Sequence, residues 1–404
     1  MPAVRTVSSA PISFRIAETK RENGGTSVTE SKRIAKWDNI RLVLIFCVVL
    51  GHIINYVERD ADLMNRIYLF IYAFHMPAFI FLSGLFSKRA VRNHRYDKAF
   101  TFLALYFLIK FALFLTRVGL AREAAFKLFS TIGVDWYALV LFLFYLVTMF
   151  LQKFDKRYVL IVSVFFGCMA GYDLTLGGRM VMARACSFYP FFLLGFWMEQ
   201  DTLLKVSRKI WAKLLGAVIL IAAGVVSALY YDDLEWLIPV LKGFSYRNLD
   251  EDVFVYGGLY RLGAYAVALL MTFAVIALIP SLRGFWSKLG SRTMSIYALH
   301  YCIIMIVCSG IKIGKHHVKY YLLTGLAEDE ALRWMLLIAL LTTVVLGLRP
   351  FDWLVRRITV PPLAKQPAAE TRATVPQTTE PLPELPDEQF EQTQPIPTVR
   401  EDDT

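Results

Sequence analysis

Long apolar stretches separated by short polar segments dominate the chain between about residues 36 and 350. Most of them approach 20 residues, the length that an α-helix needs to cross about 30 Å of hydrocarbon. A soluble core does not need such long unbroken runs. We therefore predict an all-α, polytopic membrane bundle of about ten helices, at 40–57, 66–86, 99–118, 134–152, 158–175, 184–199, 211–231, 257–279, 294–311 and 332–348.

The two ends of the chain differ from this pattern. Residues 1–36 are rich in Ser, Thr, Lys and Arg, and residues 358–404 are rich in Pro, Thr and Glu. Such compositions cannot bury an apolar core, so both segments are predicted to be disordered. Polar residues precede the first apolar run, which is not the order of a signal peptide. We expect a membrane domain at 37–357 between two cytosolic tails.

Loop charges predict the orientation of the bundle. The net charge of +11 comes largely from basic segments between apolar runs, so it indicates membrane topology rather than nucleic-acid binding. Basic loops face the cytosol, which places both termini there. The expected location is the cell membrane, a bacterial plasma membrane. The basic segments are 87–98, 152–157, 204–213 and 281–292, and the acidic loops that alternate with them lie within 57–66, 232–257 and 312–331.

The first apolar run carries an arginine and a histidine eleven positions apart, Arg41 and His52. Eleven steps of about 100° return to within roughly 20° of the same helix face, about 16 Å further along the axis. Polar side chains inside hydrocarbon are costly and usually face a functional cavity. An imidazole can act as a general base near neutral pH. In the alternative interpretation, Arg41 reaches lipid phosphate and His52 is a satisfied interhelical hydrogen-bonding group.

Two further runs carry polar side chains of less certain role. His75 precedes Pro77, which frees a backbone carbonyl one turn earlier, so His75 has either a structural or a catalytic role. Ser83 and Gly84 have no hydrolase elbow around them and favour close helix packing. In the ninth run Tyr297 and His300 share a face, and simple packing again explains the histidine.

Metal and disulfide chemistry is not indicated. The His and Cys residues do not have the spacing of a metal site, so no metal is expected. The cysteines fall within apolar runs and are predicted to be small packing residues: Cys47, Cys168, Cys186, Cys302 and Cys308.

Several strings together resemble the acyltransferase-3 family of membrane-embedded acyltransferases. They are DNIRLVLIFCVVLGH, FHMPAFIFLSG, GVDWYALVLF, FYPFFLLGF and SRTMSIYALHYCI, spread over about residues 36–350. The second string looks most like the branch related to fucose 4-O-acetylases. One departure is WYAL, which stands where the family tends to have an aromatic residue followed by Leu. This departure weakens any detailed role for Trp136 and Tyr137.

The resemblance implies O-acyl transfer, usually O-acetyl transfer, from cytosolic acyl-CoA to a hydroxyl of an extracytoplasmic glycan or glycolipid. Acetyl-CoA would be a donor substrate, and no permanently bound cofactor is expected. Arg41 and His52 match the family's pair, Arg41 for donor phosphates and His52 for the acceptor hydroxyl. The other candidates are His75 for catalysis; Lys88, Arg89, Ser83, Tyr297 and His300 for the donor; and Asn55, Trp136, Tyr137 and Arg184 for the acceptor.

Simpler interpretations exist for some of these residues. Lys88 and Arg89 also fit ordinary positive-inside charge, and Arg184 fits a side chain that reaches the membrane surface. The alternative function is a transporter or flippase for a glycan or lipid precursor, which would use the same polar residues as a pathway. A cavity leading to His52 with basic residues at its mouth favours the enzyme, whereas two symmetric gates favour transport. The sequence leaves the oligomeric state and the acceptor open.

Overall fold

The computed structural model describes residues 34–56, 62–120, 126, 133–173, 181–246, 249, 251–308, 311–313, 316–318 and 328–360. All of these residues belong to one compact unit, Met1–Pro361. Of the tails predicted to be disordered, only residues 34–36 and 358–360 are among the described residues. The acidic residues Glu58 and Asp60 also lie outside the described residues.

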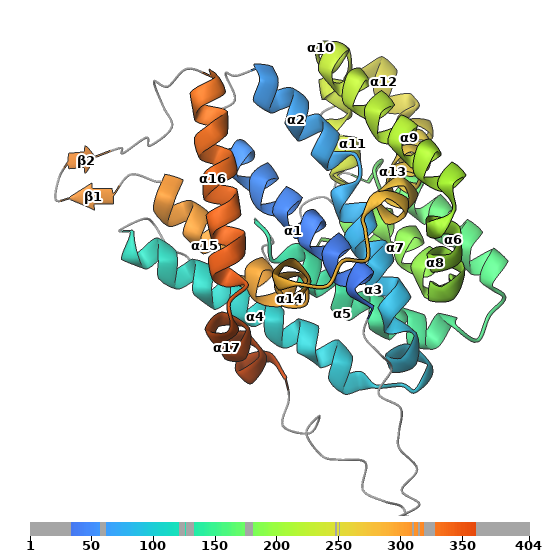
Figure 1. The fold of residues 1–404 in the computed structure, drawn as a ribbon. Coiled ribbons are helices and arrows are strands. Elements are labelled where there is room, and N and C mark those ends of the chain that lie inside the picture. The colour runs from blue at the N-terminus through green and yellow to red at the C-terminus, as the bar shows by residue number, and fades with distance from the viewer. Residues whose placement is uncertain are drawn as a thin grey trace, which may run out of the picture. The chain divides into compact units, whose positions relative to one another are not determined.

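Helices account for nearly all of the described secondary structure (Figure 1). The ten that coincide with predicted segments are α1 (Ala35–Tyr56), α2 (Asp62–Tyr72) with α3 (His75–Arg92), α4 (Tyr96–Gly119), α5 (Trp136–Leu151), α6 (Lys156–Met169), α7 (Met182–Trp197), α9 (Ile210–Leu229), α13 (Gly257–Leu278), α15 (Thr293–Cys308) and α16 (Glu328–Leu346), the pair α2–α3 being counted once. The prediction of a helical bundle is therefore confirmed.

Shorter elements complete the fold and were not predicted. They are α8 (Gln200–Arg208), α10 (Tyr231–Leu234), η1 (Glu235–Leu237), α11 (Ile238–Leu241), α12 (Glu251–Val255), α14 (Phe285–Gly290), α17 (Arg349–Thr359) and the strands β1 (Ile311–Ile313) and β2 (His316–Val318). The strands pair antiparallel, with Lys312 opposite His317, so the all-α prediction needs this small correction. Several predicted helix ends also move: α1 begins at Ala35 and α3 extends to Arg92, whereas α6 stops at Met169 and α15 at Cys308.

Five described helices are long and apolar enough to cross a membrane, taking α2 and α3 as one. A sixth is reached if the bent pair α16–α17, with a bend of 63°, counts as one span. Helices α5 and α15 are apolar but shorter. Large apolar side chains such as Phe111, Ile161 and Val218 are more than half exposed, which suits a lipid-facing surface. Ten complete spans remain a prediction.

The break between α2 and α3 follows from Pro77. Proline has no backbone N–H, and its ring clashes with the carbonyl one turn earlier. The helix is interrupted at residues 73–74, where the Ile71 carbonyl accepts from the Phe74 N–H at 3.3 Å and also lies 2.7 Å from Nδ1 of His75. The kink therefore sets the direction from which His75 enters the bundle.

Helices α3 and α7 approach each other through two glycines. A Cβ on Gly84 would collide with the backbone carbonyl of Phe192, and one on Gly195 with that of Phe81. This reciprocal contact confirms the prediction that Gly84 is a close-packing point. It fixes α3, which carries Ser83 and His75, against the helix that carries Arg184.

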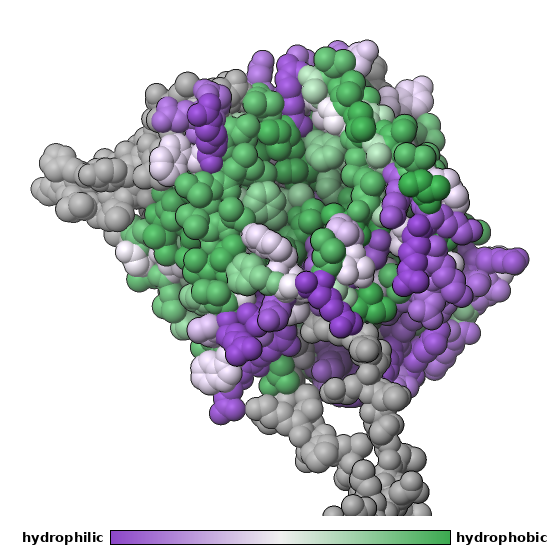
Figure 2. Space-filling model, in the orientation of Figure 1, coloured by the Kyte–Doolittle hydropathy of each residue, from purple (hydrophilic) through white to green (hydrophobic). Residues whose placement is uncertain are grey.

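Basic and acidic segments lie at opposite ends of the bundle. At one end the Asn39 amide donates to the carbonyls of Pro280 and Leu282, and Lys88 pairs with Glu199. At the other end Arg66 of α2 donates to the Ala228 carbonyl of α9. Figure 1 shows α8, α14 and α17 at the first end and α10 and α12 at the second. Figure 2 shows an apolar band between two hydrophilic ends.

Candidate active site

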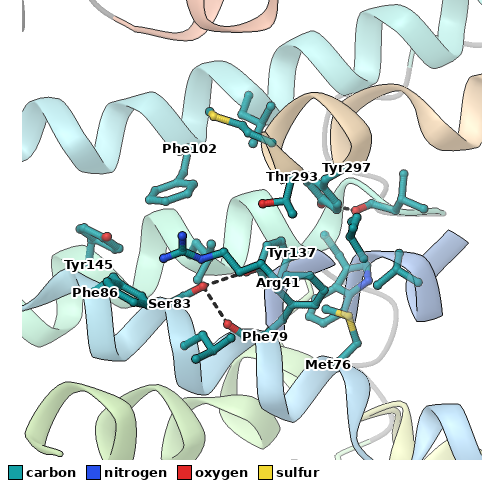
Figure 3. A pocket seen from close by; sticks show the side chains of 18 of the residues that line it. Arg41, Met76, Phe79, Ser83, Phe86, Phe102, Tyr137, Tyr145, Thr293 and Tyr297 are labelled. Atoms are coloured by element: carbon teal, nitrogen blue, oxygen red, sulfur yellow. Dashed lines mark hydrogen bonds between the residues drawn. The ribbon is translucent and has the colours of Figure 1, made fainter. Parts of the chain in front are cut away.

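A first cavity, the Arg41 cavity, has a volume of about 250 Å³ and mainly apolar walls (Figure 3). It lies between α1, α3, α4, α5 and α15. Its lining residues are Arg41, Ile45, Val48, His52, Met76, Phe79, Leu82, Ser83, Phe86, Phe102, Leu105, Val134, Trp136, Tyr137, Leu141, Tyr145, Thr293, Met294 and Tyr297.

A second cavity, the Arg184 cavity, has a volume of about 460 Å³ and more polar walls. Its lining comes mainly from α1, the α2–α3 break, α7 and residues 241–244. Its lining residues are His52, Asn55, Tyr72, His75, Met76, Arg117, Gly133, Trp136, Val181, Ala183, Arg184, Phe188, Leu241, Lys242, Phe244 and Tyr301.

The two cavities share three lining residues, His52, Met76 and Trp136. His52 therefore lies where an apolar chamber meets a cationic one. Because Arg41 and His52 share one face of α1, the Arg41 cavity follows that face from the guanidinium to the imidazole. The helix face that carries Arg41 and His52 therefore forms part of a cavity wall, and His52 borders both cavities.

Arg41 is held in place before any ligand binds. Its guanidinium donates to the carboxylate of Asp38 at 3.0 Å and lies 4.2 Å from the ring centroid of Phe86. Asp38 is buried, with 4% of its surface exposed. A planar guanidinium is suited to binding phosphate oxygens.

His52 packs against a second histidine. The ring centroids of His52 and His300 are 5.4 Å apart, and the Tyr301 ring lies 5.5 Å away, edge on. Nδ1 of His300 lies 2.8 Å from the Tyr297 carbonyl, which can only accept, so Nδ1 carries the proton. Nε2 is buried and has no hydrogen-bond partner among the described residues. His300 lines neither cavity, so the structure places it behind His52 rather than in the predicted donor site.

His75 lines the Arg184 cavity and not the Arg41 cavity. Its Nδ1 is committed to the Ile71 carbonyl, and the ring packs edge on against Tyr72 at 4.7 Å. The structural role considered for His75 is visible in this contact, whereas the catalytic role stays a prediction. Nδ1 closes the helix break, and Nε2 is the ring nitrogen left for a ligand.

The polar groups on the wall of the Arg41 cavity are engaged with one another (Figure 3). Ser83 and Tyr137 share a hydrogen bond of 2.8 Å, and the Ser83 hydroxyl also lies 2.9 Å from the Phe79 carbonyl. Tyr297 donates to the Val134 carbonyl and accepts from the Ala138 N–H at 3.3 Å. Tyr297 thereby fixes the start of α5, and the wall presents mostly ring faces to a ligand.

Trp136 lies between the cavities because the preceding residue is tied down. Asp135, 1% exposed at its side chain, pairs with Lys110 of α4 at 2.8 Å. The indole then stacks on Phe188 at 5.5 Å and lies 4.9 Å from the guanidinium carbon of Arg184. In spite of the WYAL departure, Trp136 has a defined place in the site.

Lys88 and Arg89 do not line either cavity. Lys88 donates to the Glu199 carboxylate at 2.7 Å and to the Met198 carbonyl at 2.6 Å, and this contact lowers the pKa of the Glu199 carboxyl. Arg89 is exposed beyond Phe86. Contact of either side chain with donor phosphates stays a prediction.

Three cationic residues in or next to the Arg184 cavity were not among the candidates predicted from the sequence. Arg117 and Lys242 line the Arg184 cavity, and Arg261, 1% exposed, supports it from behind. Arg261 donates to the Phe244 carbonyl at 2.6 Å and to the Ser187 hydroxyl. An arginine within an apolar run was the available signal for Arg261, whereas Lys242 lies in a loop whose path only the fold defines.

Within the described part of the chain, no group of three or more His, Cys, Asp or Glu side chains could hold a metal ion. All five cysteines are free thiols, each lying in a helix that corresponds to an apolar run. Two histidines, His52 and His75, line the cavities, and an imidazole can transfer protons near neutral pH.

An α-helical bundle with membrane-length apolar helices is typical of a multi-pass membrane protein, and this bundle holds a histidine between two cavities. The sequence profile of the acyltransferase-3 family, described as an acyltransferase domain, matches residues 34–349. The chain belongs to this family.

Two curated relatives are similar to part of the chain. The nodulation protein NolL of Sinorhizobium fredii (strain NBRC 101917 / NGR234) is 26% identical over 196 residues, covering 44% of this chain and 52% of the relative. NolL of Mesorhizobium japonicum (strain LMG 29417 / CECT 9101 / MAFF 303099) is 24% identical over 192 residues, covering 44% and 51%. The matches thus span about half the length of these relatives. No solved structure matches the chain.

Proposed function

We propose that the protein is a membrane O-acyltransferase, most simply an O-acetyltransferase, that uses acyl-CoA and modifies a hydroxyl of an extracytoplasmic glycan or glycolipid. The observation that carries this proposal is the position of His52 at the junction of the two cavities. A thioester in one chamber and a hydroxyl in the other would meet at its imidazole. Membership of the acyltransferase-3 family supports the reaction class.

The Arg41 cavity suits the donor. Arg41 binds phosphate oxygens at one end, and the apolar wall accommodates the pantetheine arm, whose thioester reaches His52. The separation of Arg41 and His52 along α1, about 16 Å, is comparable to the length of an extended arm. The cytosolic location of the Arg41 end follows from the positive-inside rule, which also places both termini in the cytosol of a bacterial plasma membrane.

His52 acts as the general base in this mechanism. It removes the proton of the acceptor hydroxyl as the oxygen attacks the thioester carbonyl. The tetrahedral intermediate collapses with cleavage of the carbon–sulfur bond, and the imidazolium returns the proton to the CoA thiolate. The products are an ester on the acceptor and free CoA, so no metal or redox group is needed to balance the reaction.

The different character of the two chambers argues against transport. A transporter that alternates between symmetric gates would present similar surfaces to one substrate on both sides of the site. Here one chamber is apolar with a single guanidinium, and the other is cationic and larger. Two different ligands that react at their junction fit this asymmetry better than one ligand that passes through.

Replacement of His52 by Ala tests the proposal. We expect acetyl transfer from labelled acetyl-CoA to fall about 10²–10⁴-fold, because general-base catalysis is typically worth that factor. Acetyl-CoA binding should be nearly unchanged, since Arg41 and the apolar wall remain. If folded protein with an unchanged melting temperature transfers acetyl at the normal rate, the mechanism is wrong.

A comparison of a deletion strain with its parent identifies the product. Mass spectrometry of extracted glycans and glycolipids should show the loss of one acetyl increment from one class of molecule, and His52→Ala should not restore it. A relation to the fucose 4-O-acetylase branch predicts that the modified class contains a deoxyhexose or a similar sugar.

A further inference from the structure

The walls of the Arg184 cavity carry an excess of positive charge. Arg117, Arg184 and Lys242 line it beside two histidines, and no described lining residue is Asp or Glu. A neutral sugar needs hydroxyl-binding groups of both kinds, whereas three cations on one small chamber attract an anion. The charge therefore has consequences for the ligand that binds next to His52.

Arg184 has guanidinium N–H groups for which the described residues provide no hydrogen-bond acceptor. Its guanidinium carbon lies 4.9 Å from the ring centroid of Trp136 and 4.3 Å from that of Phe244. Among the described residues these ring faces are its only partners, because it makes no hydrogen bond or ion pair. A half-buried guanidinium with five N–H donors is costly to leave in this state unless a ligand accepts from it.

Asp135 is an acidic residue that interacts electrostatically with Arg184. Its carboxylate already forms an ion pair with Lys110 at 2.8 Å. The ion pair of Asp135 with Lys110 has no net charge. Among the described residues, neither Arg184 nor Arg117 therefore forms an ion pair with a carboxylate.

The cationic groups belong to a rigid frame. Lys242 lies over the rings of Tyr68 and Tyr72, at 5.0 and 5.1 Å from their centroids. The buried Arg261 holds the Phe244 carbonyl, so residues 242–244 are fixed over the chamber. Side chains held in this way lose little entropy when a ligand binds.

We propose that the acceptor carries an anionic group, a carboxylate or a phosphate, which Arg184 binds while the hydroxyl to be acylated lies at His52. This inference rests on the proposed function and names the substrate class of the same site. A planar guanidinium binds two oxygens of either anion at once, which orients the acceptor as well as attracting it. The rings of Trp136 and Phe244 pack against the Arg184 guanidinium and hold it at the cavity wall.

The test uses the full chain in membranes of the producing strain, labelled acetyl-CoA and the acceptors present there. After the reaction, alkali-labile label is freed of CoA and separated by anion exchange. We expect the label in the retained, anionic fraction. Loss of retention after chemical reduction of carboxyl groups would assign a uronate-type acceptor, and loss after mild acid or phosphatase treatment would assign a phosphate.

Substitutions then connect this charge to the cavity. Arg184→Gln should raise the KM for the extracted anionic acceptor about 10–100-fold, the range of a charge-assisted hydrogen-bond pair, and leave acetyl-CoA binding unchanged. Arg184→Lys should lose less, because it retains the charge. Arg357→Gln, which removes an exposed guanidinium of α17, is the matched control and should behave as wild type.

The outcomes separate the two proposals. Alkali-labile label in the neutral fraction would overturn the anionic acceptor and leave the acyltransferase proposal intact. An unchanged KM in folded Arg184→Gln protein would do the same, as would weakened acetyl-CoA binding, which would assign Arg184 to the donor. Absence of alkali-labile label with wild-type protein would instead contradict the acyltransferase proposal itself.

Discussion

At the scale of single residues, three side chains have different positions in the candidate site: Arg41, His52 and His300. Arg41 is oriented by Asp38 and Phe86, His52 borders both cavities, and His300 packs behind His52 without lining either. The first two line the cavities in which we propose that the ligands bind. The third can act only through His52, so its substitution should have a different signature.

Arg41→Lys should weaken the donor site specifically. A lysine retains the charge but cannot hold two phosphate oxygens in a plane, so we expect the KM for acetyl-CoA to rise about tenfold or more with a smaller change in kcat. Steady-state kinetics with varied acetyl-CoA measures this. Arg357→Lys on the exposed face of α17 is the control. An unchanged donor KM would mean that Arg41 serves the fold through Asp38.

His300 should position His52. Its buried Nε2 has no hydrogen-bond partner among the described residues, and its ring packs against that of His52 with the ring centroids 5.4 Å apart. We expect His300→Ala to lower kcat about 10–100-fold with little change in either KM. His300→Gln, whose amide oxygen replaces Nε2, should recover part of the loss.

Melting temperature must be measured for both His300 variants, since a buried substitution can destabilise the bundle. A role in packing alone would lower stability in both variants without a selective recovery of kcat by Gln. Equal kcat values for Ala and Gln at equal stability would therefore rule out the positioning role.

At the level of helices, the close approach of α3 and α7 fixes the relative positions of residues that line the two cavities. α3 contributes Ser83 and His75, and α7 contributes Arg184. Among the described helices this pair has the most extensive contact, and the reciprocal glycines Gly84 and Gly195 make it possible. Any side chain at either glycine must move a backbone, not merely a flexible neighbour.

The same substitution at two glycines should have opposite effects. Gly84→Ala should destabilise the protein by about 1–3 kcal/mol or more, because its Cβ meets the Phe192 carbonyl. Gly224→Ala in α9 has nothing within 4 Å of the new Cβ and should stabilise by up to about 1 kcal/mol through helix propensity. Thermal unfolding in detergent compares them. Equal melting temperatures would show that the α3–α7 contact is looser than described.

At the scale of the whole molecule, the grouping of basic segments at one end gives the bundle a direction. The described contacts unite Asn39 with residues 280 and 282, and Lys88 with Glu199, at one end. The Arg66 contact with Ala228 lies at the other. An enzyme that draws acyl-CoA from the cytosol needs the Arg41 end to face that compartment.

Cysteine labelling of intact cells tests this orientation. We expect an impermeant maleimide to label Asp233→Cys, in the acidic segment after α9, and to leave Lys153→Cys unlabelled until the membrane is permeabilised. Both positions are exposed, so they form a matched pair. Labelling of Lys153→Cys in intact cells would reverse the orientation and place Arg41 away from the CoA pool.

The sequence by itself determined the helical class, the approximate positions of the helices along the chain and the location of Arg41 and His52 on one helix face. Apolar runs of membrane length permit little but helices, and the period of a helix assigns residues eleven apart to one face. It also anticipated Gly84 as a packing point and the effect of Pro77, because glycine and proline act through the local backbone. These features depend on residues close together in the chain.

Tertiary structure decided which side chains from distant segments surround His52. The resemblance makes His300 a donor candidate, yet in the fold it packs against His52 and lines neither cavity, since the pattern of one helix does not specify which neighbour each face meets. Lys242 and Arg117 were missed because their approach to Arg184 joins segments about 60 to 125 residues apart in sequence. A local pattern specifies an element and its faces, whereas the charge of a cavity is the sum over several elements and follows only from their packing.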